Sequence, residues 1–272
     1  MLRQRLITAI ILAPTLTFVI YAGGWWYGAL VLALLSIGTW EFVRLAHGSG
    51  VLPARWLMLP AVWALACGVL WQSGYWLGPA IAGLLVAATA WHAWQYEHGA
   101  ADPLQSWAVT IAAPLYLGVL GGYLLALRAL PDGLWWTLTI LPAVWCADGG
   151  AYMVGRLAGK HKLSVRLSPN KTWEGLVGGL VLGPLFGALL AAMWEFKVAA
   201  GSLLTWQHAL QVSFLVALVS PVGDLGISML KRQALVKDTG SLFLGHGGVL
   251  DRIDSWLVAG VVGYLYITFI GG

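Results

Sequence analysis

The sequence predicts an all-α, polytopic membrane protein of about nine transmembrane helices. Three observations predict this class: 60% of the 272 residues are hydrophobic, only 10% are charged, and the apolar runs are continuous rather than alternating. A soluble domain usually carries about 25% charged residues. Because lipid offers the backbone no hydrogen-bond partners, continuous apolar runs of about 18–25 residues are expected to be helices. A soluble enzyme, a disordered chain and a coiled coil are therefore excluded.

The expected spans follow one another through short connections. They cover about residues 5–22, 25–46, 55–72, 75–93, 104–127, 134–155, 174–194, 205–230 and 253–270. The first of them has basic residues ahead of an apolar stretch, as a secretory signal has. No convincing small-x-small cleavage site closes it and a second span follows at once, so it is interpreted as a helix of the mature chain.

The positions of the basic residues predict the orientation of the spans. With a cytoplasmic N-terminus, only Arg128 and Lys197 of the 15 basic residues fall outside. Trp25, Trp71 and Trp135 then lie near outer ends of spans, where an amphipathic ring is favoured. We expect a cytoplasmic N-terminus, an external C-terminus and a location in the cell (inner) membrane.

Residues suited to catalysis or ligand binding are concentrated after residue 147, which suggests a division of the chain. Residues 1–130 are expected to form a helical scaffold with a possible role in lipid access. Residues 131–272 are expected to form the catalytic region, with polar cytoplasmic loops at 156–173 and 231–252.

Glycines recur every four residues along the seventh span, at Gly175, Gly179, Gly183 and Gly187. Small residues at this spacing let another helix backbone approach closely. Intramolecular helix packing is the favoured interpretation, and a homodimer seam stays open as the other.

Carboxylates occur at membrane depth in the second half of the chain. Asp148 and Asp224 lie within or at the ends of apolar spans, and Asp251 and Asp254 open the last one. A carboxylate at this depth is costly, so it usually faces a protein interior or a wet cavity and has a cationic partner. Several of them beside a basic cluster favour a functional role over structural ion pairs.

The spacing of these residues sharpens the prediction. Asp224, Ser228 and Lys231 lie on one stripe of a helix, and Asp251 and Asp254 share a face. Mg²⁺ commonly takes one or two carboxylates together with waters and substrate phosphates, and Asp224 and Asp251 would supply such a pair. The absence of a His or Cys cluster argues against zinc.

Two cytoplasmic loops have the composition of phosphate-binding segments. Residues 155–174 and 231–252 interleave Lys and Arg with Gly, Ser and Thr. Exposed backbone N–H groups and cationic side chains both favour a polyphosphate. A solvated positive loop against anionic headgroups has the same composition, so the loops alone leave both interpretations open.

Two sets of motifs make the prediction specific. The first set comprises Ser228-Met-Leu-Lys231-Arg232, Lys237-Asp238-x-Gly240 and His246-Gly247-Gly248-x-x-Asp251-Arg252-x-Asp254. The second comprises Asp148-Gly-Gly-Ala-Tyr152, Gly159-Lys160-His161-Lys162-Leu163 and Ser168-Pro169-x-Lys171-Thr172-x-Glu174-Gly175. Together they resemble the signature of phosphatidate cytidylyltransferases (CDP-diacylglycerol synthases). Leu244 stands where that family usually has Pro, and Ile227 where a Glu commonly precedes the Ser; neither departure touches the paired aspartates.

The resemblance implies a reaction in which CTP and phosphatidic acid give CDP-diacylglycerol and pyrophosphate, for phospholipid biosynthesis. The implied cofactor is Mg²⁺, and a second cation is left open. The implied partners are CTP, phosphatidic acid and the lipid bilayer, with a homodimer possible and no nucleic acid. The active site is expected to face the cytoplasm.

The resemblance also implies roles for individual residues. Asp224 and Asp251 are the expected metal ligands, and they form the catalytic set with Lys231 and Arg252. Asp238 and Asp254 are expected to orient basic residues. The residues expected to bind substrate are Asp148, Lys171, Thr172, Ser228, Arg232, Lys237, His246, Gly247 and Gly248.

Two other functions stay open at this point. A CTP-dependent kinase of a polyprenol-type lipid would need a base for a neutral hydroxyl, for which Asp251 or His246 is available. An ion-coupled transporter also uses acidic residues in spans, but its sites usually lie near the midplane within internal repeats. Here the charges gather toward the cytoplasmic edge and no repeat is evident.

Overall fold

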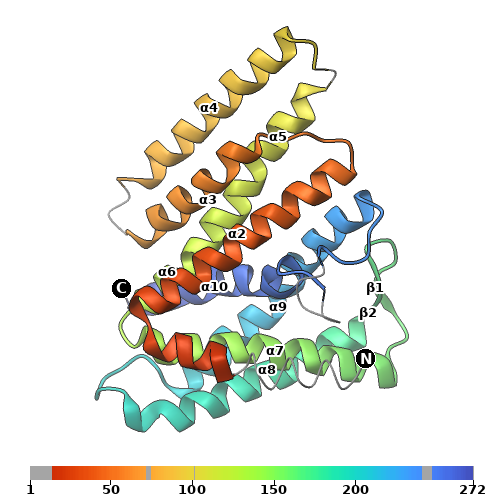
Figure 1. Cartoon of the computed structure of the whole chain (residues 1–272). Helices are drawn as coiled ribbons and strands as arrows, with labels where there is room; N and C mark the ends of the chain where they lie inside the picture. The colour runs from red at the N-terminus through yellow and green to blue at the C-terminus, as the bar shows by residue number, and fades with distance from the viewer. Residues whose placement is uncertain (1–13, 72–74, 101, 241–246, 272) are drawn as a thin grey trace. The chain divides into compact units, whose positions relative to one another are not determined.

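The structure is a computed structural model that describes residues 14–71, 75–100, 102–240 and 247–271 (Figure 1). Residues 14–22 are helical. The helices after them are α2 (Gly24–Gly48), α3 (Arg55–Leu70), α4 (Leu77–Glu97), α5 (Pro103–Pro114), the π-helix η1 (Leu115–Val119), α6 (Leu120–Ala129), α7 (Gly133–Ala158), α8 (Trp173–Trp194), the 3₁₀-helix η2 (Glu195–Lys197), α9 (Trp206–Gln233) and α10 (Leu250–Gly271). The two strands are β1 (Lys162–Ser164) and β2 (Ser168–Thr172).

Six of the described segments are long and apolar enough to cross a membrane. They are α2, α4, the continuous segment Pro103–Ala129, Trp173–Lys197, α9 and α10. Helix α3 is apolar but shorter, with 16 residues. The helical membrane-protein class is therefore confirmed. The number of nine spans and the orientation of the termini stay predictions, and the first expected span begins outside the described residues.

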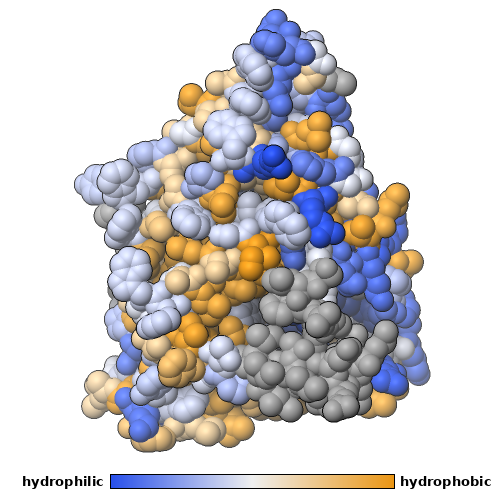
Figure 2. All heavy atoms as spheres, viewed as in Figure 1, coloured by the Kyte–Doolittle hydropathy of each residue, from blue (hydrophilic) through white to orange (hydrophobic). Residues whose placement is uncertain are grey.

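Large apolar side chains are exposed on the described surface, as helices in lipid require. Trp25, Val86 and Leu157 are examples, and hydrophobic side chains lie on the face seen in Figure 2. A soluble protein would bury most such side chains against its core.

The chain divides into two compact units, and the boundary falls within α6, α9 and α10. Unit 1 comprises Met1–Ala126 and Leu230–Ile253, and unit 2 comprises Leu127–Met229 and Asp254–Gly272. Each unit is described by itself below. The predicted functional division at residue 130 stays a prediction.

Helix α3 lies at the centre of the helix packing in unit 1, against α2, α4, α5 and η1. Its residues Met58, Val62 and Leu65 are fully buried. Gly118 of η1 packs directly on the α3 backbone, because a Cβ there would lie 2.8 Å from the carbonyl oxygen of Val62. The π-helix therefore brings its glycine against α3 in a contact that a larger residue would prevent.

In unit 2, α7 and α8 run side by side along their lengths (Figure 1). The predicted glycine stripe is the contact surface. A Cβ at Gly179 would lie 2.9 Å from the carbonyl oxygen of Ala147, and one at Gly183 would lie 2.7 Å from the Cβ of Ala147. The intramolecular interpretation of the stripe is confirmed here, since α7 covers it.

The connection between α7 and α8 contains a β-hairpin that the sequence analysis did not anticipate. Strands β1 and β2 pair antiparallel, with Lys162 opposite Thr172 and Ser164 opposite Ser168. Thr172 then ends the hairpin and begins α8, because its Oγ1 accepts a hydrogen bond from Gly175 N at 3.1 Å. The all-α prediction is correct for the helices and incomplete for this loop.

The close approach of α7 and α8 gives a first prediction. Gly179→Val would drive a branched side chain into the α7 backbone and is expected to lower the free energy of unfolding by about 1–3 kcal/mol. Thermal unfolding in detergent measures the change. The matched control is Gly83→Val on α4, where an added Cβ meets nothing within 4 Å. Equal loss of stability in both variants would contradict the packing described.

Candidate active site

Asp251, in the first turn of α10, is held by donors on both carboxylate oxygens. Its Oδ1 accepts a hydrogen bond from Lys231 Nζ at 2.6 Å. Its Oδ2 accepts from Thr239 N at 2.9 Å and from Gly248 N at 3.1 Å, and lies 3.0 Å from Thr239 Oγ1. The side chains of Asp251 and Lys231 are only 8% and 11% exposed. The carboxylate therefore has a fixed orientation within unit 1.

A second carboxyl group, Glu41 on α2, lies beside this cluster and is 1% exposed. It accepts hydrogen bonds from Val249 N and Leu250 N, both at 2.9 Å, and from Thr239 Oγ1 at 2.8 Å. Sequence reasoning missed Glu41. The criterion applied to Asp224, an acidic residue inside an apolar span, would have found it in the expected span 25–46.

In unit 2, Asp224 on α9 forms an ion pair with Lys171 on β2. Both side chains are about 30% exposed, so the pair is only partly buried. The hairpin explains why two residues distant in sequence meet, since β2 carries Lys171 immediately before α8. Ser228, one turn beyond Asp224 on the same helix, is buried.

Glu174 fixes the start of the hairpin onto α8. Its carboxylate accepts hydrogen bonds from Lys160 N at 3.1 Å and His161 N at 3.2 Å, and its Oε1 lies 2.6 Å from His161 Nδ1. The side chain also lies in the first turn of α8, where negative charge is favoured by the helix dipole. Glu174 therefore connects the end of α7 to the beginning of α8.

The other expected catalytic, orienting and substrate-binding residues have varied surroundings. Arg232, Lys237, Asp238 and Arg252 are exposed in unit 1, and Asp148 is exposed in unit 2. Gly247 has a positive φ of 80°. Gly248 is buried, and its N–H donates to Asp251 rather than facing an open space.

Four further residues named from the sequence are Asp254, Ile227, Leu244 and His246. Asp254 is 4% exposed in unit 2, and its Oδ1 accepts from Ser255 N at 2.6 Å. Its expected role in orienting basic residues stays a prediction. Ile227 is buried, whereas His246 and Leu244 lie outside the described residues.

The two expected metal ligands belong to different units, Asp224 to unit 2 and Asp251 to unit 1. Their joint coordination of one ion stays a prediction. Among the residues that the structure describes, no group of three or more His, Cys, Asp and Glu side chains is arranged to hold a metal ion. What the structure does give is one lysine partner for each of the two aspartates.

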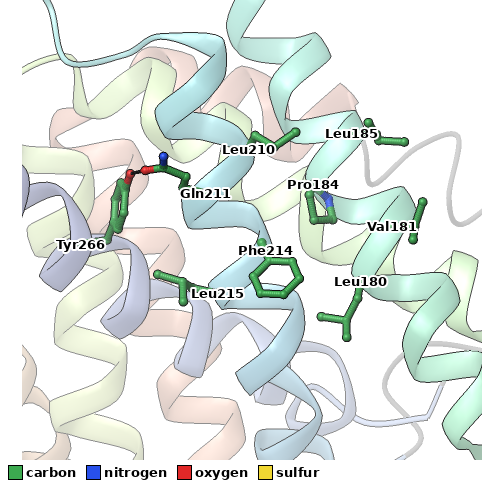
Figure 3. A pocket seen from close by; sticks show the side chains of 9 residues that line it. All are labelled: Leu180, Val181, Pro184, Leu185, Leu210, Gln211, Phe214, Leu215 and Tyr266. Carbon is green, nitrogen blue, oxygen red and sulfur yellow. Dashed lines mark hydrogen bonds between the residues drawn. The ribbon is translucent and has the colours of Figure 1, made fainter.

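An apolar groove of about 540 Å³ opens in unit 2 between α8 and α9 (Figure 3). Its one hydrogen-bonded polar feature is at the end near α10, where Tyr266 Oη donates to Gln211 Oε1. Leu215, the lining residue nearest to Asp224 in sequence, precedes it by about 14 Å of helix at 1.5 Å per residue. The groove is lined by Leu180, Val181, Pro184, Leu185, Leu210, Gln211, Phe214, Leu215 and Tyr266.

Comparison with known protein families decides the affiliation of the chain. The model of the cytidylyltransferase family matches residues 3–270, which is almost the whole sequence. The chain belongs to the cytidylyltransferase family. The motifs quoted from residues 148–254 are thus part of a match that also includes the apolar first half.

Relatives of full length carry a more specific name. The chain is 35% identical to the phosphatidate cytidylyltransferase of Pseudomonas aeruginosa, over 95% of this chain and 94% of the relative. It is 32% identical to the enzyme of that name from Haemophilus influenzae, over 99% of both chains. A third, from Synechocystis, is 30% identical over 98% of this chain and 97% of its own.

The contacts of Glu174 in this cytidylyltransferase give a second prediction. Glu174→Gln removes the negative charge that binds the His161 ring and accepts hydrogen bonds from the backbone N–H groups of Lys160 and His161. The hairpin is therefore expected to open more often. Hydrogen exchange of peptides covering residues 160–172 should rise by about threefold or more. The control is Glu97→Gln, at the exposed end of α4. Unchanged exchange in the Glu174 variant would show that these contacts do not hold the hairpin.

Proposed function

We propose that this cytidylyltransferase transfers CMP from CTP to phosphatidic acid, giving CDP-diacylglycerol and pyrophosphate at the cytoplasmic side of the inner membrane. The observation that carries the proposal is the family match over residues 3–270, together with full-length relatives named phosphatidate cytidylyltransferase. The two lysine–aspartate pairs support it, because both are formed by residues of the quoted motifs.

The proposed chemistry joins two anions. A phosphate oxygen of phosphatidic acid attacks the α-phosphorus of CTP, a new P–O bond forms, and the bond to pyrophosphate breaks. The second pKa of a phosphate monoester is about 6, so this nucleophile is largely ionised at neutral pH and needs no strong general base. The barrier is then dominated by charge repulsion and positioning, as in phosphoryl transfer generally.

Cationic side chains of the chain are suited to reduce that repulsion. An ammonium has three N–H donors, so Lys231 is able to hold Asp251 and a phosphate oxygen at the same time. Arg232 and Arg252 lie next to these residues in sequence, and both are exposed. Lys171 has the corresponding place beside Asp224. In this proposal the aspartates orient the lysines toward the triphosphate.

Mg²⁺ is the proposed cofactor, with Asp224 and Asp251 as its protein ligands. The donor set fits a hard cation, which takes one or two carboxylates and completes its shell with water and substrate phosphates. The Oδ1 of Asp251 has one hydrogen-bond partner and Oδ2 has three, so Oδ1 is the oxygen proposed to bind the cation. When bound, the ion would neutralise phosphate charge in the transition state. A second cation would share this role.

The apolar groove of unit 2 is the proposed place for an acyl chain of the lipid substrate. Eight of its nine lining residues lie on α8 and on the stretch of α9 that precedes Asp224. The separation of about 14 Å along α9 resembles the depth that an acyl chain reaches below its headgroup in a bilayer whose apolar core is about 30 Å thick. A headgroup near Asp224 would therefore leave a tail at the level of the groove.

Labelled nucleotide tests the proposed reaction. Purified protein with phosphatidic acid, Mg²⁺ and CTP labelled at the α-phosphorus is expected to yield labelled lipid. CTP labelled at the γ-phosphorus is expected to yield labelled pyrophosphate and unlabelled lipid. Transfer of the γ-label to a lipid would contradict the proposal and indicate a kinase.

Neutralising Asp251 gives a third prediction. Asp251→Asn is expected to lower turnover at least about 100-fold, because it removes charge at the phosphate and metal position. The measurement is pyrophosphate release, with size-exclusion chromatography to establish that the variant is folded. Asp102→Asn is the control, since Asp102 is exposed and its side chain makes no cap hydrogen bond to α5. An active Asp251→Asn enzyme would remove Asp251 from the mechanism.

Filling the groove gives a fourth prediction. Leu215→Trp is expected to raise the KM for long-chain phosphatidic acid about tenfold, with the KM for CTP and the kcat nearly unchanged. Short-chain phosphatidic acid should be affected less. Leu218→Trp is the control, because Leu218 is exposed on α9 and does not line the groove. Equal KM values in the two variants would show that the lipid lies elsewhere.

A further inference from the structure

We infer that Glu41 is a positioning residue for Asp251, which it orients by fixing both the start of α10 and the hydroxyl of Thr239. The inference rests on the proposed function, in which Asp251 is catalytic. All of the contacts that carry it lie within unit 1.

Glu41 caps α10 from another helix. The first N–H groups of a helix have no intrahelical acceptor, and a carboxylate near them is favoured by the helix dipole. Val249 N and Leu250 N, at the start of α10, both donate to Glu41 at 2.9 Å. Because Asp251 follows directly in the chain, the direction in which it leaves the helix is set by this cap.

Thr239 connects the two carboxyl groups. Its Oγ1 lies 2.8 Å from Glu41 Oε2 and 3.0 Å from Asp251 Oδ2, and its backbone N–H donates to the same Oδ2 at 2.9 Å. A hydroxyl has one proton and donates to one acceptor at a time. A change at Glu41 therefore alters what Thr239 offers to Asp251, although the two carboxylates, both acceptors, do not bond to each other directly.

Two glycines of the segment that precedes α10 pack against Glu41. A Cβ at Gly248 would lie 2.5 Å from both carboxyl oxygens of Glu41, and a Cβ at Gly240 would lie 2.9 Å from its Cδ. Gly248 is an expected substrate-binding residue, and these contacts give the absence of a side chain there a steric reason. The chain thus closes around Glu41 with residues small enough to allow its three hydrogen bonds, from Val249 N, Leu250 N and Thr239 Oγ1.

The chemistry of the group matters as well as its size. A buried donor that loses its acceptor destabilises the folded structure. In Glu41→Gln the side chain keeps its shape, but one of the two oxygens becomes an NH₂ group. Whichever way the amide is turned, this NH₂ faces at least one backbone N–H of α10, since Val249 N donates to Oε1 and Leu250 N to Oε2. The variant is therefore expected to shift the start of α10 without emptying the site.

A double-mutant cycle tests the inference. Glu41→Gln and Thr239→Val are each expected to lower kcat about tenfold or more, measured per folded protein at saturating CTP and phosphatidic acid. The KM for CTP should stay within about threefold of the unmodified protein. Because the two residues share the contact between Thr239 Oγ1 and Glu41 Oε2, the double variant should lose less than the product of the two single losses. Thr239→Ser keeps the hydroxyl and should retain activity.

Glu97→Gln is the matched control, exposed at the end of α4, and should leave kcat and hydrogen exchange unchanged. Hydrogen exchange of peptides covering residues 247–253 should rise in Glu41→Gln and not in Glu97→Gln. A kcat within twofold of the unmodified protein, or losses that multiply in the double variant, would overturn the inference. So would a variant that only unfolds at lower temperature while its kcat is unchanged.

Two outcomes keep this test separate from the proposed reaction. If the unmodified protein does not form CDP-diacylglycerol, the proposed function fails, and the exchange experiment still decides whether Glu41 fixes α10. If Glu41→Gln does not fold, the comparison of Thr239→Val with Thr239→Ser decides, because these residues differ in the hydroxyl that links the two carboxyl groups.

Discussion

The need to match buried carboxylates with donors organises unit 1. A carboxylate away from water is costly unless hydrogen bonds or a cation compensate it. Asp251 has Lys231 on one oxygen and amide donors on the other, and the nearly inaccessible Glu41 receives Val249 N, Leu250 N and Thr239 Oγ1. These bonds join α2, the loop before α10 and α10 itself. The position of the proposed catalytic carboxylate thus depends on a helix more than 200 residues earlier in the chain.

Unit 2 meets the same requirement by a different local structure. Lys171 reaches Asp224 because a short antiparallel hairpin places it beside α9, and Thr172 and Glu174 then anchor the hairpin to α8. Each proposed metal ligand is therefore already paired with an ammonium. Charges oriented before the substrate arrives need little reorganisation when a polyphosphate binds, which is the usual source of catalysis for this kind of transfer.

The features that follow from long apolar runs or regular spacing were predictable from the sequence. The expected spans from 25–46 to 253–270 coincide with described helices to within a few residues, and the glycine stripe packs on α7 as favoured. The hairpin was not predictable, because its strands are short and polar and lack alternation. The ion pair of Lys171 and Asp224 depends on that hairpin, so it was not predictable either. Glu41 could have been found as an acidic residue inside an expected span, but it carries no motif, and its partners are given only by the folded loop.

The fixed carboxylate of Asp251 is the proposed cation-binding group. Titration of the detergent-solubilised protein with Mn²⁺, followed through the electron paramagnetic resonance signal of the free ion, tests it without relying on turnover. We expect the unmodified protein and Asp102→Asn to bind the ion alike, and Asp251→Asn to bind it about tenfold or more weakly. Equal affinity of all three proteins, or no binding by the unmodified one, would contradict the account.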